Sequence, residues 1–447
     1  MFKKIIYGPA FYFSRIFYIT AIVIITLFAC AFFFQPLLII AKVFLLGLII
    51  ITFTDFLILY FKRKPISAGR YCADRFSNGD DNKIHIEFIN NLNYKVHFTF
   101  IDEVPVQFQL RNFEKEMNVN ANQTGDFVYV LKPLERGEYK FGIINIFLYG
   151  PLNMLIRHIK SGEEKSVAVY PSYIQMRRFH LMAITNQLQQ TGSVRLRKIG
   201  NSLEFEQIKE YVIGDDYRTI NWKASARRNS IMVNNFTDER SQQVICLIDK
   251  CRTMKMPFEG MTLLDYAINA TLALSNIILL KQDKVGLLTF GKKIDQFVYP
   301  DKKPTQISLI QETLYRQQTE FLDSDFDALY TFIRYRIKQR GLLILFTNFE
   351  SIYGMERQLP FLIQIASHHA LLVVFFENTE LLQLQTKKAN SLEEIYNQTI
   401  ANKFAFEKRQ IVKELQKHGI MVLLTPPQKL TANTINKYME IKARQLL

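Results

Sequence analysis

The stretch VICLIDKCRT, Val244 to Thr253, decides the fold of the carboxyl-terminal half of the chain. It begins as an almost wholly apolar run, which is typical of a strand buried on both faces, and ends as a polar loop. Similar apolar runs follow at 285–290, 342–348, 371–376 and 420–425. Amphipathic segments separate them, so we expect a doubly wound α/β fold with a parallel sheet covered by helices on both faces. The expected helices are 263–280, 304–318, 326–339, 355–368, 392–417 and 431–446.

The first 64 residues have a different character. Residues 16–34 carry no charge, and after Gln35 and Pro36 an apolar run continues over residues 37–61, in which Lys42 is an awkward residue. Each run has about the ~20 residues that a helix needs to cross ~30 Å of hydrocarbon. Basic residues flank both outer ends, so the positive-inside tendency predicts a multi-pass protein of the plasma (inner) membrane with both termini in the cytoplasm.

A cleavage site near Cys30 is the rival interpretation of this segment. Residues 27–30 faintly imitate a lipoprotein box, and residues 29–31 imitate a signal-peptidase site. The sequence that follows is again apolar, whereas a mature protein would begin with polar residues. A transmembrane helical hairpin over residues 1–64 therefore remains the prediction.

Residues 65–175 alternate between apolar and polar side chains, with polar turns in between. Several short alternating runs without helical periodicity predict a β-sandwich. This segment has no cluster of histidine, cysteine and carboxylate side chains, so we expect a spacer or an interaction module. The expected strands include 84–88, 94–100, 106–110, 127–131 and 141–149.

The formal charge of +15 suits a partner that is either a nucleic acid or an anionic membrane surface. Aromatic residues are not interleaved with the basic cluster, and no helix-turn-helix or RNP motif appears. We therefore expect contact with the membrane and no nucleic-acid binding. The four cysteines are widely scattered, which excludes a disulfide framework or a CxxC zinc site. The basic cluster is Arg195, Arg197, Lys198, Arg227 and Arg228.

A second informative stretch is YVIGDDYRTINWKASARR, residues 211–228, which holds the only tryptophan of the chain. Three interpretations compete: a catalytic carboxylate pair, a docking surface, and a structural network of aspartates paired with basic side chains. The nearby guanidinium groups favour the network over an open metal site, and Trp222 is then expected to pack as an anchor. The residues concerned are Gly214, Asp215, Asp216, Arg218, Trp222, Lys223 and Arg227.

GDDYRTINWKASAR, residues 214–227, followed about twenty residues later by a strand that ends in Asp and then by CRTM, resembles the signature of the bacterial "domain of unknown function 58" family. The match continues through residues 262–294 and the closing residues 434–447. The resemblance implies two amino-terminal membrane helices, a β-rich segment and a von Willebrand factor A-like, Rossmann-type α/β domain. The expected domains are a hairpin (1–64, with helices at 16–34 and 37–61), a β-sandwich (65–175), a junction with the signature (176–242) and the α/β domain (243–447).

A von Willebrand A domain often carries a metal-ion-dependent adhesion site, in which oxygen ligands hold Mg²⁺. The resemblance places Asp249 at its first position. A thiol and an amide replace two of the usual ligands, and basic residues lie next to Asp249, so we expect no cofactor or at most weak Mg²⁺ binding. Asp249 then caps the following turn or pairs with Arg252. The candidate ligands are Asp249, Cys251, Thr253, Ser324 (with Asp325 as an alternative) and Asn348.

The resemblance also implies a MoxR-type AAA ATPase as partner and a role in assembling or maturing other complexes, often of the cell envelope. We accordingly expect a non-enzymatic adaptor or scaffold that binds proteins at the membrane. The alternative is a metal-dependent hydrolase that uses Asp249 and Thr253. The loop DKCRT also half-imitates the nucleophile loop of haloacid-dehalogenase-type phosphatases, but Cys251 is a poor substitute for their general acid.

Overall fold

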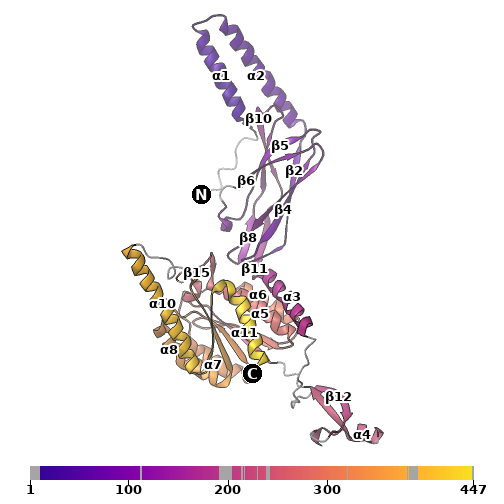
Figure 1. The fold of residues 1–447 in the computed structure, drawn as a ribbon. Helices are drawn as coiled ribbons and strands as arrows, with labels where there is room; N and C mark the ends of the chain where they lie inside the picture. The colour runs from indigo at the N-terminus through magenta and orange to yellow at the C-terminus, as the bar shows by residue number, and fades with distance from the viewer. Residues whose placement is uncertain are drawn as a thin grey trace. The chain divides into compact units, whose positions relative to one another are not determined.

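The computed structural model describes residues 11–110, 113–190, 204–212, 215, 217–228, 230–237, 242–319, 321–379, 381 and 391–444. The chain divides into two compact units, Met1–Tyr170 and Pro171–Leu447 (Figure 1). Helix α3 (Tyr173–Gln190) packs against α5 (Leu263–Leu280) of the second unit. The boundary predicted between residues 175 and 176 therefore falls inside α3, and the junction that carries the signature is part of the second unit.

The first unit opens with a helical hairpin, α1 (Arg15–Ala31) and α2 (Leu37–Tyr60), whose two helices lie side by side (Figure 1). The Ser14 hydroxyl caps α1 by accepting from the N–H of Ile16 at 3.3 Å. Among the described residues, α2 and α5 are long and apolar enough to cross a membrane. Most of α5 is buried within the second unit, whereas the side chains of α2 are largely exposed. Helix α1 is apolar but shorter.

The rest of the first unit is β-rich and has three sheets around one hydrophobic core. Inward-facing Phe88 of β4 contacts Phe98 and Phe100 of β5 at ring distances of 5.0 and 4.7 Å, which joins two of the sheets. The sheets are β1-β10-β9-β5-β6, β2-β4-β7 and β3-β11-β8. Their strands are β1 (Phe11–Phe13), β2 (Ile66–Cys72), β3 (Arg75–Ser77), β4 (Asn82–Asn90), β5 (Val96–Asp102), β6 (Glu114–Val119), β7 (Thr124–Leu131), β8 (Gly137–Phe141), β9 (Ile144–Tyr149), β10 (Leu155–Ser161) and β11 (Lys165–Tyr170).

The prediction of a strand at 106–110 is wrong. These residues include the 3₁₀ helix η1 (Val106–Phe108), which follows Pro105. Gln109 closes the turn with a φ of 52°, and such a left-handed residue does not continue a strand. The alternation of apolar side chains therefore arose here in a turn.

The second unit is built on a six-stranded sheet with the order β18-β17-β14-β19-β20-β21. Every neighbouring pair is parallel except β17 and β18, so the purely parallel sheet predicted from sequence is corrected to a mixed one. Only residues 291–293 join β17 to β18, and so short a connection can link only antiparallel strands. The strands are β14 (Gln243–Asp249), β17 (Lys284–Phe290), β18 (Ile294–Asp301), β19 (Leu342–Phe346), β20 (Ala370–Phe376) and β21 (Met421–Thr425).

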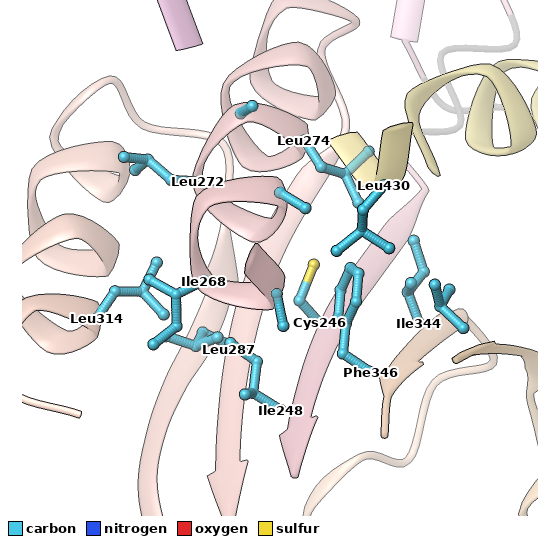
Figure 2. Packing of buried hydrophobic residues seen from close by; sticks show 14 of the residues in the cluster. Cys246, Ile248, Ile268, Leu272, Leu274, Leu287, Leu314, Ile344, Phe346 and Leu430 are labelled. Atoms are coloured by element: carbon cyan, nitrogen blue, oxygen red, sulfur yellow. The ribbon is translucent and has the colours of Figure 1, made fainter. Parts of the chain in front are cut away.

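Helices cover both faces of this sheet. Cys246 and Ile248 of β14 belong to the core on the α5 face, which Figure 2 shows together with Ile268 of α5, while the alternate residues Ile245 and Leu247 join the core on the opposite face. The first face packs against α3, α5, α6 (Thr305–Tyr315) and α11 (Leu430–Ala443), and the second against α7 (Phe326–Arg336), α8 (Ile352–His368) and α10 (Leu392–Lys417).

The remaining described elements of this unit are short. A two-stranded sheet of β12 (Glu204–Glu210) and β13 (Met232–Thr237) carries the 3₁₀ helix η2 (Tyr217–Thr219) and the helix α4 (Trp222–Arg228). The others are η3 (Arg252–Lys255), β15 (Pro257–Phe258), β16 (Met261–Thr262) and η4 (Pro427–Lys429). The signature stretch thus lies on its own small hairpin.

Asp55 of α2 joins the hairpin to the β-rich core. Its side chain is fully buried, and its two oxygens accept from the backbone N–H groups of Leu152, Met154 and Leu155 at 3.0–3.1 Å. Gly150 permits this approach, because a Cβ there would lie 2.3 Å from the carboxylate oxygens. The loop before β10 is therefore shaped around one carboxylate.

Arg157 of β10 makes a second connection. Its guanidinium group donates to the last carbonyl groups of α2 and to those just after it, which have no partner within the helix. Its backbone pairs with Phe11 of β1, the strand that precedes α1. The accepting carbonyls are those of Leu59 (2.6 Å), Lys62 (2.9 Å) and Arg63 (3.0 Å).

Candidate functional site

The candidate site lies where the winding of the six-stranded sheet reverses. Numbered along the chain, the strands stand in the spatial order 3-2-1-4-5-6, so the reversal falls between β14 and β19. Ligand sites of doubly wound sheets lie beyond the carboxyl ends of the strands at such a point. Asp249 ends β14, and Thr347 directly follows β19. Strand order therefore brings these two residues to one crevice.

Asp249 is 1% exposed and fully engaged in hydrogen bonds. One carboxylate oxygen accepts from the Cys251 N–H at 2.9 Å and from the Ser324 hydroxyl. The other accepts from the Thr347 hydroxyl at 2.7 Å and from the Cys251 thiol at 3.3 Å. Burial raises the pKa of the Asp249 carboxyl, and the hydrogen bonds act in the opposite direction. Arg252 pairs with Asp323 at 3.4 Å, not with Asp249.

Thr253 extends this network toward the next strand. Its hydroxyl donates to the Asn348 carbonyl at 2.9 Å and lies 2.9 Å from the Cys251 sulfur. The Asn348 side chain is used elsewhere, because its oxygen accepts from the Lys408 ammonium at 2.9 Å. Four predicted ligands thus lie together, whereas Asn348 does not present its side chain to Asp249. The residue that does so is Thr347, which the predicted set omitted.

The donor set fits a closed hydrogen-bond network better than it fits Mg²⁺. It offers one carboxylate, and each of its oxygens already accepts two hydrogen bonds. Asp325, the alternative ligand, instead caps α7 by accepting from two backbone N–H groups. Within the described part of the chain, no group of three or more His, Cys, Asp and Glu side chains is placed to hold a metal ion.

Two cavities adjoin the network. A polar cavity of about 330 Å³ is bordered by Asp249, Thr347 and Arg357, and a more apolar one of about 460 Å³ by Phe376, Phe404 and other carbon-rich side chains. Asn348 borders both cavities. Both lie at the same edge of the sheet, so polar and apolar surface lie side by side there.

Two side chains next to the network have shifted pKa values. Burial and the charge of Asp249 raise the pKa of the Cys251 thiol to about 12, so this thiol stays protonated near neutral pH and is a poor nucleophile. Burial lowers the pKa of the Lys408 ammonium to about 8. The crevice thus holds a protonated thiol and a saturated carboxylate, which together make no nucleophile and base pair.

The signature stretch forms a different surface. Gly214 and Asp216 lie outside the described residues. Asp215 accepts from the Lys209 ammonium at 2.8 Å and from the Val212 N–H at 3.0 Å, and these bonds lower its pKa. Asp215 thus pairs with a lysine of β12, which was not among the basic residues expected to pair with the aspartates. The Arg218 guanidinium group lies 5.7 Å from the centre of the neighbouring Tyr217 ring.

Trp222 is 73% exposed, so the prediction that it packs as an anchor against the sheet domain is wrong. The reason is the orientation of α4. Its Ser225 side packs on β13, with the hydroxyl accepting from the Met232 N–H at 2.9 Å. At 100° per residue, Trp222, Lys223 and Arg227 then share the outward face, and all three are exposed.

Comparison with known proteins places the β12–β13 hairpin and the crevice around Asp249 in one family region. Residues 207–385 match the model described as "Protein of unknown function DUF58". This region belongs to the DUF58 family. The resemblance predicted from residues 214–227 and the following strand is thereby confirmed. Trp222, Asp249 and Thr347 all lie inside the matched range.

A curated relative of this DUF58 region is the uncharacterized protein YeaD of Bacillus subtilis (strain 168), which is 24% identical over 171 residues. That alignment covers 38% of this chain and 40% of YeaD, so the chain spans well under half of the length of its relative. Its name assigns no activity.

Two solved structures of the CARDB domain of the Pyrococcus furiosus PF1109 protein also match. They are a crystal structure in complex with di-metal ions and a solution structure, with 10% and 9% identity and TM-scores of 0.18 and 0.16. They cover 23% and 24% of this chain, and 86% and 94% of their own chains. Scores this low carry no argument about fold or metal binding.

Proposed function

We propose that this protein is a membrane-anchored, non-enzymatic adaptor that binds protein partners through the second unit. One observation carries the proposal: Trp222 stands 73% exposed beside Lys223 and Arg227 on the outward face of α4. Tryptophan and arginine are enriched among the residues that dominate protein–protein binding energy. A large aromatic side chain left in water on a short helix is therefore a docking feature.

The helical hairpin of α1 and α2 supports the membrane anchor. Helix α2 has 24 residues and spans ~36 Å, which exceeds the ~30 Å of a bilayer core. Its apolar side chains are exposed over most of its length, as with Ile39 at 69% and Val43 at 63%. So large an apolar surface is unfavourable in water and suits lipid. We propose insertion in the plasma (inner) membrane with both outer ends of the hairpin in the cytoplasm.

A von Willebrand A-like fold is part of the same proposal. It is supported by the 3-2-1-4-5-6 strand order, by the antiparallel edge strand β18, and by helices on both faces. The saturated carboxylate of Asp249 supports a role in binding over catalysis. The partner that the family resemblance suggests is a MoxR-type AAA ATPase, acting in assembly or maturation of envelope complexes.

The test is quantitative affinity purification of the full chain from native membranes after mild crosslinking. Trp222→Ala is compared with Tyr335→Ala, because Tyr335 is 74% exposed on α7, outside the β12–β13 hairpin. Loss of a hot-spot tryptophan costs about 2 kcal/mol or more, so we expect at least one partner to fall roughly tenfold or further with Trp222→Ala alone. An AAA ATPase among the lost partners supports the family-derived assignment. Partner lists that are the same for wild type and Trp222→Ala contradict the docking role.

A further inference from the structure

A groove of about 430 Å³ lies on the hairpin, between α2 on one side and β1 with the start of α1 on the other. Its volume is within the ~300–1,000 Å³ of small-molecule sites. The α2 wall is a single stripe with helical spacing: Leu45, Leu48, Ile49, Thr52, Phe53 and Phe56. The Thr52 hydroxyl donates to the Leu48 carbonyl at 2.7 Å within the helix, so the stripe presents carbon atoms.

The two helices beside the groove differ in length. Helix α1 has 17 residues and spans ~25 Å, whereas α2 spans ~36 Å, so about 10 Å of α2 has no helix opposite it. Aromatic rings of β1 and α1 form the facing wall. Phe13 stacks on Phe17 at 4.2 Å, and Phe11 lies 6.3 Å from Phe56.

Both walls are fixed in place. Asp55 binds three backbone N–H groups of the loop before β10, which holds α2 to the β-rich core. The pairing of β1 with β10 holds Phe11 and Phe13. Rotation of either helix to close the groove would break these bonds, so the described residues leave the hollow open.

We propose that this groove binds one acyl chain of a bilayer phospholipid. The inference rests on the anchor part of the proposed function. Acyl chains are the solvent of an inserted hairpin, and a carbon-lined hollow without polar partners does not hold water stably. The β1 end adjoins the β-rich unit and is rich in aromatic rings, as is typical of the membrane–water interface. The headgroup then stays at the interface while the chain lies along α2.

The single tryptophan makes a fluorescence test specific. Trp222→Phe yields a tryptophan-free full-length chain, into which Phe53→Trp places a probe in the groove and Ile50→Trp places a control one turn away, outside the lining residues. Both proteins are reconstituted with dibrominated phosphatidylcholine and then exchanged into unbrominated vesicles. We expect the control to recover its emission fully and the groove probe to stay at least twofold quenched. Equal recovery means exchanging annular lipid only and overturns the proposal.

Native mass spectrometry of the full chain tests the same site without a probe. We expect one retained phospholipid, which Leu48→Trp removes by filling the groove and Leu46→Trp, at an exposed position outside the lining residues, leaves in place. A lipid retained equally by both variants, or a dimer without lipid, overturns the proposal. Extraction of the protein by alkaline carbonate refutes the anchor itself. Resistance to carbonate together with equal fluorescence recovery refutes only the lipid site.

Discussion

Asp55 and Asp249 are both buried carboxylates, and their surroundings give them different roles. Asp55 accepts from three backbone N–H groups of a single loop, and Gly150 leaves it just enough room. Three of the four donors to Asp249 are side chains, those of Cys251, Ser324 and Thr347, and the site lies beside a polar cavity of about 330 Å³.

The difference teaches that burial alone does not identify a functional carboxylate. Backbone donors cannot turn away, so the Asp55 contacts form a permanent joint. Hydroxyl donors can rotate, so the Asp249 contacts can be exchanged for those of a ligand that enters the crevice. Substitutions at the two carboxylates should therefore have different effects.

The largest effect is expected for Asp55→Ala. Three N–H groups, of which that of Leu155 is buried, lose their partner at about 1–3 kcal/mol for a buried group, so we expect a loss of roughly 3 kcal/mol in the unfolding free energy of the β-rich part of the first unit. Calorimetry of the full chain in detergent measures it, and hydrogen exchange should show faster exchange at residues 152–155. Asp74→Ala, at an exposed ion pair with Lys165, is the control and should change neither quantity. An unchanged melting temperature for Asp55→Ala would show that the joint is dispensable.

Gly150→Ala tests the same joint from the other side. The added methyl group would lie 2.3 Å from the Asp55 oxygens, so the loop or the helix must shift. Overpacking of this kind costs typically ~1–3 kcal/mol. Thermal unfolding of the β-rich unit is the measurement, and Gly47→Ala, where a Cβ meets nothing within 4 Å, is the control. Equal stability of the two variants would contradict the close approach.

A smaller, pH-dependent effect is expected for Asp249→Asn. The raised pKa of Asp249 means that the folded state favours the protonated form, so the stability it contributes is complete below the ordinary value of 3.8 and declines as the pH rises toward the folded-state pKa. The wild type should exceed Asp249→Asn by about 1–2 kcal/mol near pH 4, with the gap narrowing as the pH rises. Denaturant unfolding from pH 4 to 8 measures this. Thr347→Val removes a donor to the carboxylate, so the decline in stability should extend to higher pH in this variant. A stability difference between wild type and Asp249→Asn that widens with pH would be inconsistent with a raised pKa of Asp249.

The smallest effect is expected from Mg²⁺. A donor set already saturated by internal hydrogen bonds should bind it weakly, so millimolar Mg²⁺ should raise the melting temperature by no more than about 1 °C. A rise of several degrees that Asp249→Asn abolishes would instead support an adhesion-type site. The same preparation should not turn over a generic phosphoester, and turnover lost in Asp249→Asn would favour the hydrolase alternative.

Local patterns were sufficient to predict much of the second unit. The predicted helices 263–280 and 392–417 match α5 and α10 to the residue, because Thr262 and Ser391 cap them and their apolar periodicity is clear. Strand β18 was missed because three of its eight residues are exposed and only one is buried, and because it includes Pro300, so it lacks the continuous apolar run of its neighbours.

The sites were harder to predict, since their contacts join distant segments. Asp55 accepts hydrogen bonds from residues about a hundred positions away, so no pattern near it in the sequence predicts these contacts. Thr347 and Asn348 are adjacent, and which of them faces Asp249 depends on how the chain leaves β19. The exposure of Trp222 depends on which side of α4 packs on β13, and in a helix of seven residues composition does not decide this.

Arg157 makes contacts near the outer ends of both helices of the hairpin, and these contacts have a mechanical consequence. Its backbone holds the strand that leads into α1, and its side chain holds the carbonyls at the exit of α2. The start of α1 and the end of α2 are therefore both attached to Arg157. A piston-like slide of one helix along the other must break one of these fastenings, whereas a tilt of the whole hairpin leaves both intact. Any signal that passes along this hairpin should travel as a tilt.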